Sequence, residues 1–225
     1  MKDIPMFTTD FGVATLILKE IPYKSIAYVR VLDVQPGMIK ELMDECIGFC
    51  RAAGADLVFA AGSPELEVYL LHHSVRVMRG NDLWEPEANL FPVTEETVKR
   101  WREIYNEKMA SVDGSGTLTV WDEKEILNSG GAYFVHREGA LLGIGWVEEG
   151  KLICVASCVP GMGAAVTRTL LSAQGSVSVE LEVASTNARA IRLYEALGFV
   201  TTGERSAWYK IVERNADMQL RKNDK

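Results

Sequence analysis

The chain has few of the residues that build metal centres and disulfide frameworks. Its 225 residues include three histidines and four cysteines. The cysteines form two pairs, Cys46 with Cys50 and Cys154 with Cys158, and neither has the C-x-x-C spacing of a zinc site. In an extended strand, four residues at ~3.3 Å each would place the sulfurs of the second pair roughly 13 Å apart, too far for a disulfide. We therefore expect no metal, and free thiols in a reducing cytoplasm.

The sequence also lacks long apolar runs and basic clusters. No apolar run approaches the ~20 residues of a membrane helix, and residues 1–6 do not resemble a secretion signal. We therefore expect a cytoplasmic protein that does not span a membrane. Lysine and arginine number 24 against 31 aspartates and glutamates, a net charge of −7. Nucleic acid is thus an unexpected partner, and a positively charged substrate suits the balance better.

The first part of the chain alternates short apolar segments with turns. Residues 13–18 and 26–32 are rich in β-branched residues and predict strands. A helix is predicted after Gly37, because the apolar residues there follow the 3, 4, 7, 8 spacing of one buried face. Residues 57–61 predict a buried strand, and residues 74–78 predict a short closing strand.

A polar, proline-containing connector follows at residues 80–93 and predicts a domain boundary, dividing the chain into residues 1–85 and 86–225. The second half predicts an α/β fold of the α+β type, with a mixed, mostly antiparallel sheet flanked by helices. Both halves share an order of strands, helix and strand, which fits either a degenerate duplication or coincidence. The elements predicted in the second half are strands at residues 132–135, 141–147, 152–157, 177–183, 199–201 and 207–212, and helices at residues 94–109, 163–174 and 187–197.

A glycine-rich turn joins a predicted strand to a predicted helix. The backbone N–H groups of Gly161, Met162, Gly163 and Ala164 can point outward there, at the positive end of the helix dipole. Such a turn suits an anion such as a pyrophosphate. It is also a common structural turn, and it does not have the full glycine pattern of a dinucleotide-binding fingerprint.

A longer motif follows, with the sequence L-E-V-A-S-T-N-A-R-A-I-R-L-Y-E-A-L-G-F at residues 181–199. It resembles a signature of the GNAT superfamily of acyl-CoA N-acyltransferases, and most closely the branch that acetylates protein N-termini. The resemblance covers residues 94–212, and the first half resembles, more faintly, a degenerate GNAT-like half. The family usually has glutamine or arginine where this chain has Cys158, which puts the affinity for the CoA pyrophosphate in question.

The resemblance implies acetyl-CoA as co-substrate. Its pantetheine arm would lie along the splayed strand before the glycine turn and pair with backbone groups of Val155, Ala156 and Ser157, as an added strand does. The Val155 amide would also receive the carbonyl oxygen of the acyl group. Asn187 would hydrogen-bond the cofactor, and asparagine at this position is also a good helix cap.

The resemblance also implies two catalytic residues. A primary amine with a pKa near ~10 must lose a proton before it attacks, and Glu182 is the candidate base. Tyr194 is the candidate donor to the departing CoA thiolate. The alternatives are a solvent-facing strand carboxylate and a core tyrosine. We therefore predict an N-acetyltransferase acting on a small-molecule or peptide amine by direct attack. The rival predictions are a catalytically degenerate CoA-binding protein and a protein-interaction module.

Overall fold

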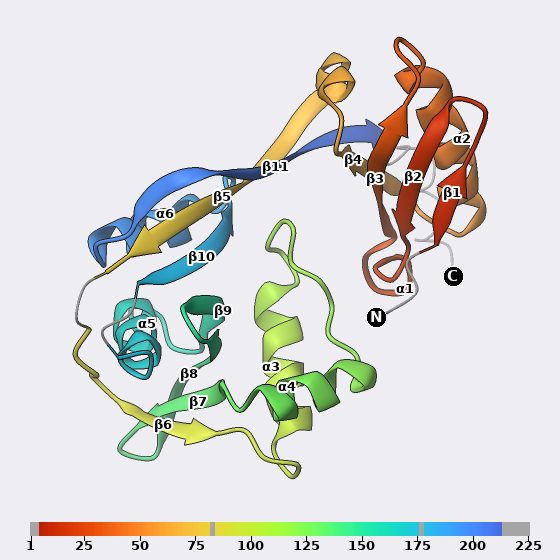
Figure 1. Cartoon of the computed structure of the whole chain (residues 1–225). Helices are drawn as coiled ribbons and strands as arrows, with labels where there is room; N and C mark the ends of the chain where they lie inside the picture. The colour runs from red at the N-terminus through yellow and green to blue at the C-terminus, as the bar shows by residue number, and fades with distance from the viewer. Residues whose placement is uncertain (1–4, 82–83, 176–177, 213–225) are drawn as a thin grey trace. The chain divides into compact units, whose positions relative to one another are not determined.

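The computed structural model describes residues 5–81, 84–175 and 178–212 (Figure 1). The chain divides into two compact units, one formed by residues 1–74 with 206–225 and the other by residues 75–205. Within the described residues, every helix is too short or too polar to traverse a bilayer.

The first unit is a sheet with one helix packed on it. Strands β1, β2 and β3 are antiparallel neighbours, β4 pairs parallel to β3, and the end of β11 pairs antiparallel to β4. The predicted amphipathic helix is confirmed as α2, whose buried residues are Ile39, Leu42, Met43, Cys46 and Cys50. The elements of this unit are β1 (Met6–Thr8), β2 (Gly12–Ile17), α1 (Ile21–Lys24), β3 (Ile26–Val34), α2 (Ile39–Ala52), β4 (Leu57–Ala61) and the short helix η1 (Pro64–Val68).

The second unit contains the predicted mixed sheet. Its strand order is β11-β5-β10-β9-β8-β7-β6, and among the pairs with a described register only β9 and β10 run parallel. The predicted fold class is confirmed. Its elements are β5 (Leu70–Gly80), β6 (Asn89–Pro92), α3 (Val98–Met109), η2 (Val120–Asp122), α4 (Glu123–Ser129), β7 (Ala132–Arg137), β8 (Ala140–Glu148), β9 (Lys151–Ser157), α5 (Gly163–Ser172), β10 (Val179–Ala184), α6 (Ala188–Ala196) and β11 (Val200–Val212). Strands β5 and β11 each have residues in both units.

Two apolar cores hold helices against this sheet. The first joins α5 and α6 to β5, β9 and β10, with Leu170, Leu181 and Tyr194 among its buried members. The second joins α3 and α4 to β7, β8 and β9 around Trp101 and Trp146, whose rings meet edge to face at 6.4 Å. Strand β9 therefore has one helical pair on each side, and its alternate side chains contribute to both cores.

Several predicted boundaries were wrong. Helix α3 begins at Val98 and not at Thr94, because residues 94–97 form a hydrogen-bonded turn. The predicted strands 199–201 and 207–212 are one continuous strand, β11. Part of the predicted connector is strand β6, which pairs with β7. The errors at β6 and β11 concern short segments whose state is decided by a distant pairing partner rather than by their own pattern.

The division into units also differs from the predicted halves 1–85 and 86–225. Residues 75–80 of β5 belong to the second unit, where β5 lies between β10 and β11. A strand that precedes the predicted boundary is thus built into the sheet of the second unit. The interpretation of the first half as a degenerate copy stays a prediction.

Candidate active site

The parallel ladder between β9 and β10 is two residue pairs long. Residues 151–152 pair with residues 180–181, and the ladder ends there although β9 continues to Ser157 and β10 to Ala184. On its other side, β9 stays paired with β8 as far as Ser157. Residues 153–157 therefore have an unpaired edge on the side of β10, which we call the open edge of β9 (Figure 1).

A bulge in β9 coincides with the end of this ladder. The β8–β9 register shifts between the pair Trp146–Cys154 and the pair Val147–Leu152, which leaves Ile153 without a partner on β8. A bulge bends the strand that carries it and increases its twist. We attribute the separation of β9 from β10 to this extra residue.

Backbone groups of alternate residues of β9 point to the open edge. The Cys158 N–H donates to the Leu142 carbonyl at 2.8 Å, so by alternation the backbone of Ala156 also bonds to β8. The backbone groups of Val155 and Ser157 then point the other way, toward the open edge. Two of the three predicted strand residues can therefore pair with an extended ligand, whereas the Ala156 backbone is used by the β8 ladder.

The glycine turn before α5 presents free backbone N–H groups. Met162 donates its N–H to the Val159 carbonyl at 3.2 Å, whereas the N–H groups of Gly161, Gly163 and Ala164 have no acceptor within the described part of the chain. Gly161 has a φ of 82°, and a Cβ there would meet nothing within 4 Å, so the turn is open on that side. Three of the four predicted amides are therefore available at the positive end of α5.

Asn187 begins helix α6. Its Oδ1 accepts the Ala190 N–H at 3.1 Å, which confirms the capping role. Its Nδ2 has no hydrogen-bond partner among the described residues and stays available as a donor. Helix α6 also lies against the glycine turn, because a Cβ added to Gly163 would be 3.5 Å from Leu193 Cδ2.

Tyr194 lies in the second turn of α6, 8% exposed and packed against Phe199 with ring centroids 5.9 Å apart. Burial raises the pKa of the Tyr194 hydroxyl above its usual value, and the Cys154 thiol raises it further. The hydroxyl has no hydrogen-bond partner among the described residues, so its proton is free to be donated to a ligand.

Glu182 belongs to a row of charges on β5, β10 and β11. Its Oε1 lies 2.9 Å from Arg205 Nε, and the two side chains are 49% and 52% exposed. Arg205 Nη2 also lies 3.4 Å from Glu180 Oε1, and Arg79 donates twice to Glu180 Oε2 at 2.9 and 2.8 Å. Sequence reasoning missed both arginines. Nothing local marks them, since Arg79 and Glu180 are 101 positions apart.

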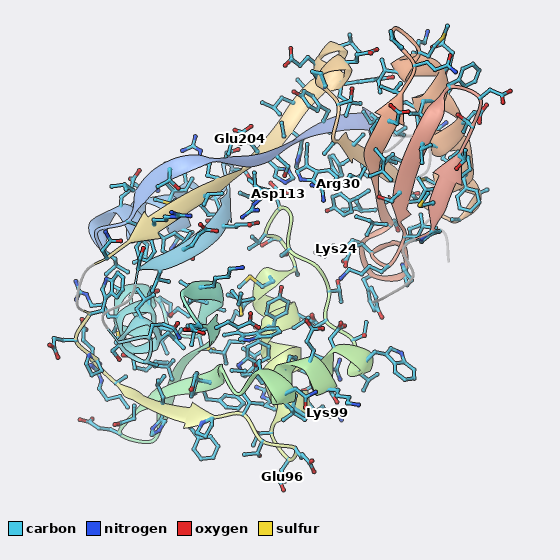
Figure 2. The ribbon with its side chains drawn as sticks, in the orientation of Figure 1. Lys24, Arg30, Glu96, Lys99, Asp113 and Glu204 are labelled. Carbon is cyan, nitrogen blue, oxygen red and sulfur yellow. The ribbon has the colours of Figure 1, made fainter. Side chains whose placement is uncertain are left out.

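The loop between α3 and α4 reaches the residues that follow the C-terminal end of β10. Asp113, at the tip of this loop in Figure 2, accepts a hydrogen bond from the Thr186 hydroxyl at 2.7 Å. Thr186 precedes the Asn187 cap. The loop is therefore anchored to the turn between β10 and α6, next to residues that the sequence predicts to bind cofactor.

Cys158 stands where the resemblance predicts glutamine or arginine. It is half-buried, and burial raises the pKa of its thiol. Lys108 and Arg100 of α3 lower that pKa, whereas Glu107 of the same helix raises it. The charges near this position are therefore of both signs, and they come from α3 and not from the turn itself.

Comparisons with solved structures identify the fold. The chain is similar to a GCN5-related N-acetyltransferase from Sphaerobacter thermophilus, with a TM-score of 0.59 and 16% identity over 90% of this chain and 77% of that one. It is also similar to one from Kribbella flavida, with a TM-score of 0.58 and 15% identity over 96% and 93%. A tandem GNAT protein from the clavulanic acid pathway has a TM-score of 0.53 and 15% identity over 89% and 78%. No family model and no curated protein matches the sequence. The chain therefore has a GNAT-like fold, as its motif predicts.

Proposed function

We propose that this protein is an N-acetyltransferase that moves an acetyl group from acetyl-CoA to a primary amine by direct attack. The observation that supports it best is the two-pair ladder between β9 and β10, which leaves an open edge next to the free amides of α5. An extended arm ending in a pyrophosphate matches that arrangement, because an edge strand pairs with an amide-containing chain and a helix N-terminus receives an anion.

The residues that would hold acetyl-CoA come from three elements. The backbone of Val155 and Ser157 would pair with the pantetheine arm, the amides of the Gly161 turn would receive the pyrophosphate, and Asn187 Nδ2 would donate to the arm. Acetyl-CoA supplies an activated acyl group. The Val155 N–H, which points to the open edge, would stabilise negative charge on the carbonyl oxygen.

Glu182 would accept the proton of the amine. A primary amine with a pKa near ~10 is charged at neutral pH and cannot attack until it is deprotonated. Glu182 is half-exposed on β10, so either direct transfer or transfer through a water is open to it.

Tyr194 would stabilise the departing thiolate. Its raised pKa keeps the hydroxyl protonated throughout the neutral range. Even at an unperturbed pKa, complete proton transfer from tyrosine to a thiolate of pKa ~8.5 costs about 2 kcal/mol, and burial adds to this cost. The structure therefore favours hydrogen-bond donation over complete proton transfer.

The test is release of free CoA thiol from acetyl-CoA in the presence of a panel of amines. We expect amine-dependent release by the wild-type protein, and a loss of at least tenfold in Glu182→Gln at pH 7. The deficit should shrink as the pH approaches the pKa of the amine, because the amine then needs no base. A degenerate CoA-binding protein would also be stabilised by acetyl-CoA, by ~2.7 kcal/mol at 100 times the dissociation constant, but it would release no thiol.

We further infer that residues 1–85 are a degenerate GNAT-like half without a CoA site. In the first unit β3, α2 and β4 repeat the strand, helix and parallel strand arrangement of β9, α5 and β10. The sequence P-G-M precedes both α2 and α5, and its glycines, Gly37 and Gly161, have φ values of 79° and 82°. The similarity between the two turns, in sequence and in backbone conformation, supports the inference of a duplication.

Two features of the first unit argue against a second CoA site. The β3–β4 ladder is five pairs long, from Ile26–Leu57 to Arg30–Ala61, whereas the β9–β10 ladder has two pairs. The Glu65 carboxylate accepts the Gly37 N–H at 3.1 Å and thus occupies the place where an anion would bind. Calorimetric titration with acetyl-CoA should give one site per chain, and Glu65→Gln should leave that number unchanged. Two sites in the wild-type protein would contradict the inference.

A further inference from the structure

The charges around Glu182 restrict which amines can approach it. Arg205 contacts both Glu182 and Glu180, and Arg79 contacts Glu180. The row thus alternates in sign and its formal charge is zero. A polyamine would bring its positive charges next to the Arg205 guanidinium, which lies 2.9 Å from the Glu182 carboxylate, and like charges repel.

Arg205 has unused hydrogen-bonding capacity. Its Nε contacts the Glu182 carboxylate and its Nη2 contacts that of Glu180, whereas its Nη1 has no partner among the described residues. A guanidinium with free N–H groups is the side chain best suited to bind a carboxylate. Both Arg205 and Glu182 are about half exposed, so a ligand can reach them from solvent.

Glu182 and Arg205 place an anionic and a cationic side chain next to each other. In an α-amino acid the ammonium and the carboxylate are bonded to the same carbon, so a single ligand brings a partner for each. Glu182 Oε1 and Arg205 Nε are in direct contact at 2.9 Å, and such a ligand has to come between them. Exposed ion pairs contribute little to stability, so the two side chains can part to admit a ligand. Glu180 and Arg79 stay bonded to each other outside the site.

The geometry points to an acceptor that has a carboxylate next to its amine, an α-amino acid in chemical class. Its ammonium would face Glu182, which accepts the proton, and its carboxylate would face Arg205. This inference rests on the proposed acetyl transfer and makes Arg205 a residue that determines specificity. A polyamine or a simple alkylamine would be a poor acceptor.

The test compares free amino acids with the amines that lack their carboxylate. Kinetics are measured with acetyl-CoA for the twenty amino acids, for phenethylamine and isobutylamine as the decarboxylated forms of phenylalanine and valine, and for spermidine. We expect the best amino acid to exceed the amine lacking its carboxylate by at least tenfold in kcat/KM. In Arg205→Gln we expect kcat/KM for that amino acid to fall about 10- to 100-fold, mainly through KM, with little change for the amine.

Arg79→Gln is the matched control, because it removes an arginine of the same row that does not contact Glu182. It should leave the ratio of amino acid to amine unchanged. Higher kcat/KM with spermidine or the simple amines, or an equal loss for both acceptor classes in Arg205→Gln, would overturn the inference and leave the acetyltransferase intact. If no amine of any kind releases thiol, the proposed function itself fails, and the inference fails with it.

Discussion

Replacing Tyr194 with phenylalanine removes a single oxygen atom from the second unit, and the structure separates its effects on folding and on rate. The hydroxyl has no hydrogen-bond partner among the described residues, so its loss leaves no buried group unsatisfied. The ring keeps its packing against Phe199. We therefore expect the free energy of unfolding to change by less than about 1 kcal/mol.

The rate should respond differently. A hydrogen bond to a charged group contributes ~1.5–3 kcal/mol, and a thiolate is charged only as it departs. Loss of that bond should lower kcat by about 10- to 100-fold with little change in the KM for acetyl-CoA. The measurement is the initial rate of thiol release at saturating acetyl-CoA, with thermal unfolding as the test of integrity.

The control is Tyr69→Phe. Burial also raises the pKa of Tyr69, but this tyrosine belongs to the first unit, where the Glu65 carboxylate already accepts the N–H of Gly37 in the corresponding turn. It should keep its full rate. If Tyr194→Phe retains wild-type kcat within a factor of two, the hydroxyl does not act on the leaving group and Tyr194 is a core residue.

The structure makes three further predictions about stability and reactivity. Gly145→Ala should destabilise the fold by about 1–3 kcal/mol in urea titrations, because the new Cβ would lie 2.1 Å from Leu170 Cδ1, whereas Gly203→Ala, which meets nothing within 4 Å, should not. Because the folded pKa of Tyr194 is raised, its contribution to stability is complete below the unfolded pKa of ~10 and is lost as the pH rises above it, so wild type should lose more stability than Tyr194→Phe in alkaline melts. Burial raises the pKa of Cys46 to about 12 and that of Cys50 to about 11, so iodoacetamide at pH 8 should alkylate each at least about 100-fold more slowly in the native protein than in urea, with Cys46 the slower of the two; equal rates would show that α2 is not packed as described.

Local patterns in the sequence predicted the helices and the motif well. The apolar stripe of α2 and the cap of α6 depend on residues within a few positions of one another, and both are confirmed. The motif at residues 181–199 is one uninterrupted segment of the sequence, and it predicted the GNAT-like fold. The repeated P-G-M turn was also present in the sequence and could have indicated how the two halves correspond.

Which backbone groups are available to a ligand could be decided only from the register of the strands. The sequence placed Val155, Ala156 and Ser157 on one strand, but only the pairing with β8 shows that Ala156 points away from the open edge. In the same way, four backbone N–H groups of the glycine turn were predicted to be free, but that of Met162 donates to the Val159 carbonyl within the turn. Alternation along a strand is local, whereas its phase is set by the neighbouring strand.

The sequence by itself determined where helices α2 and α6 and the chemical motif lie, because capping and periodicity act over a few residues. Only the tertiary structure decided that β5 lies between β10 and β11, that a bulge separates β9 from β10, and that Arg205 is paired with Glu182. These features depend on contacts between residues far apart in the chain. The packing of the whole sheet decides these three features, and no short segment of the sequence contains enough information to predict that packing.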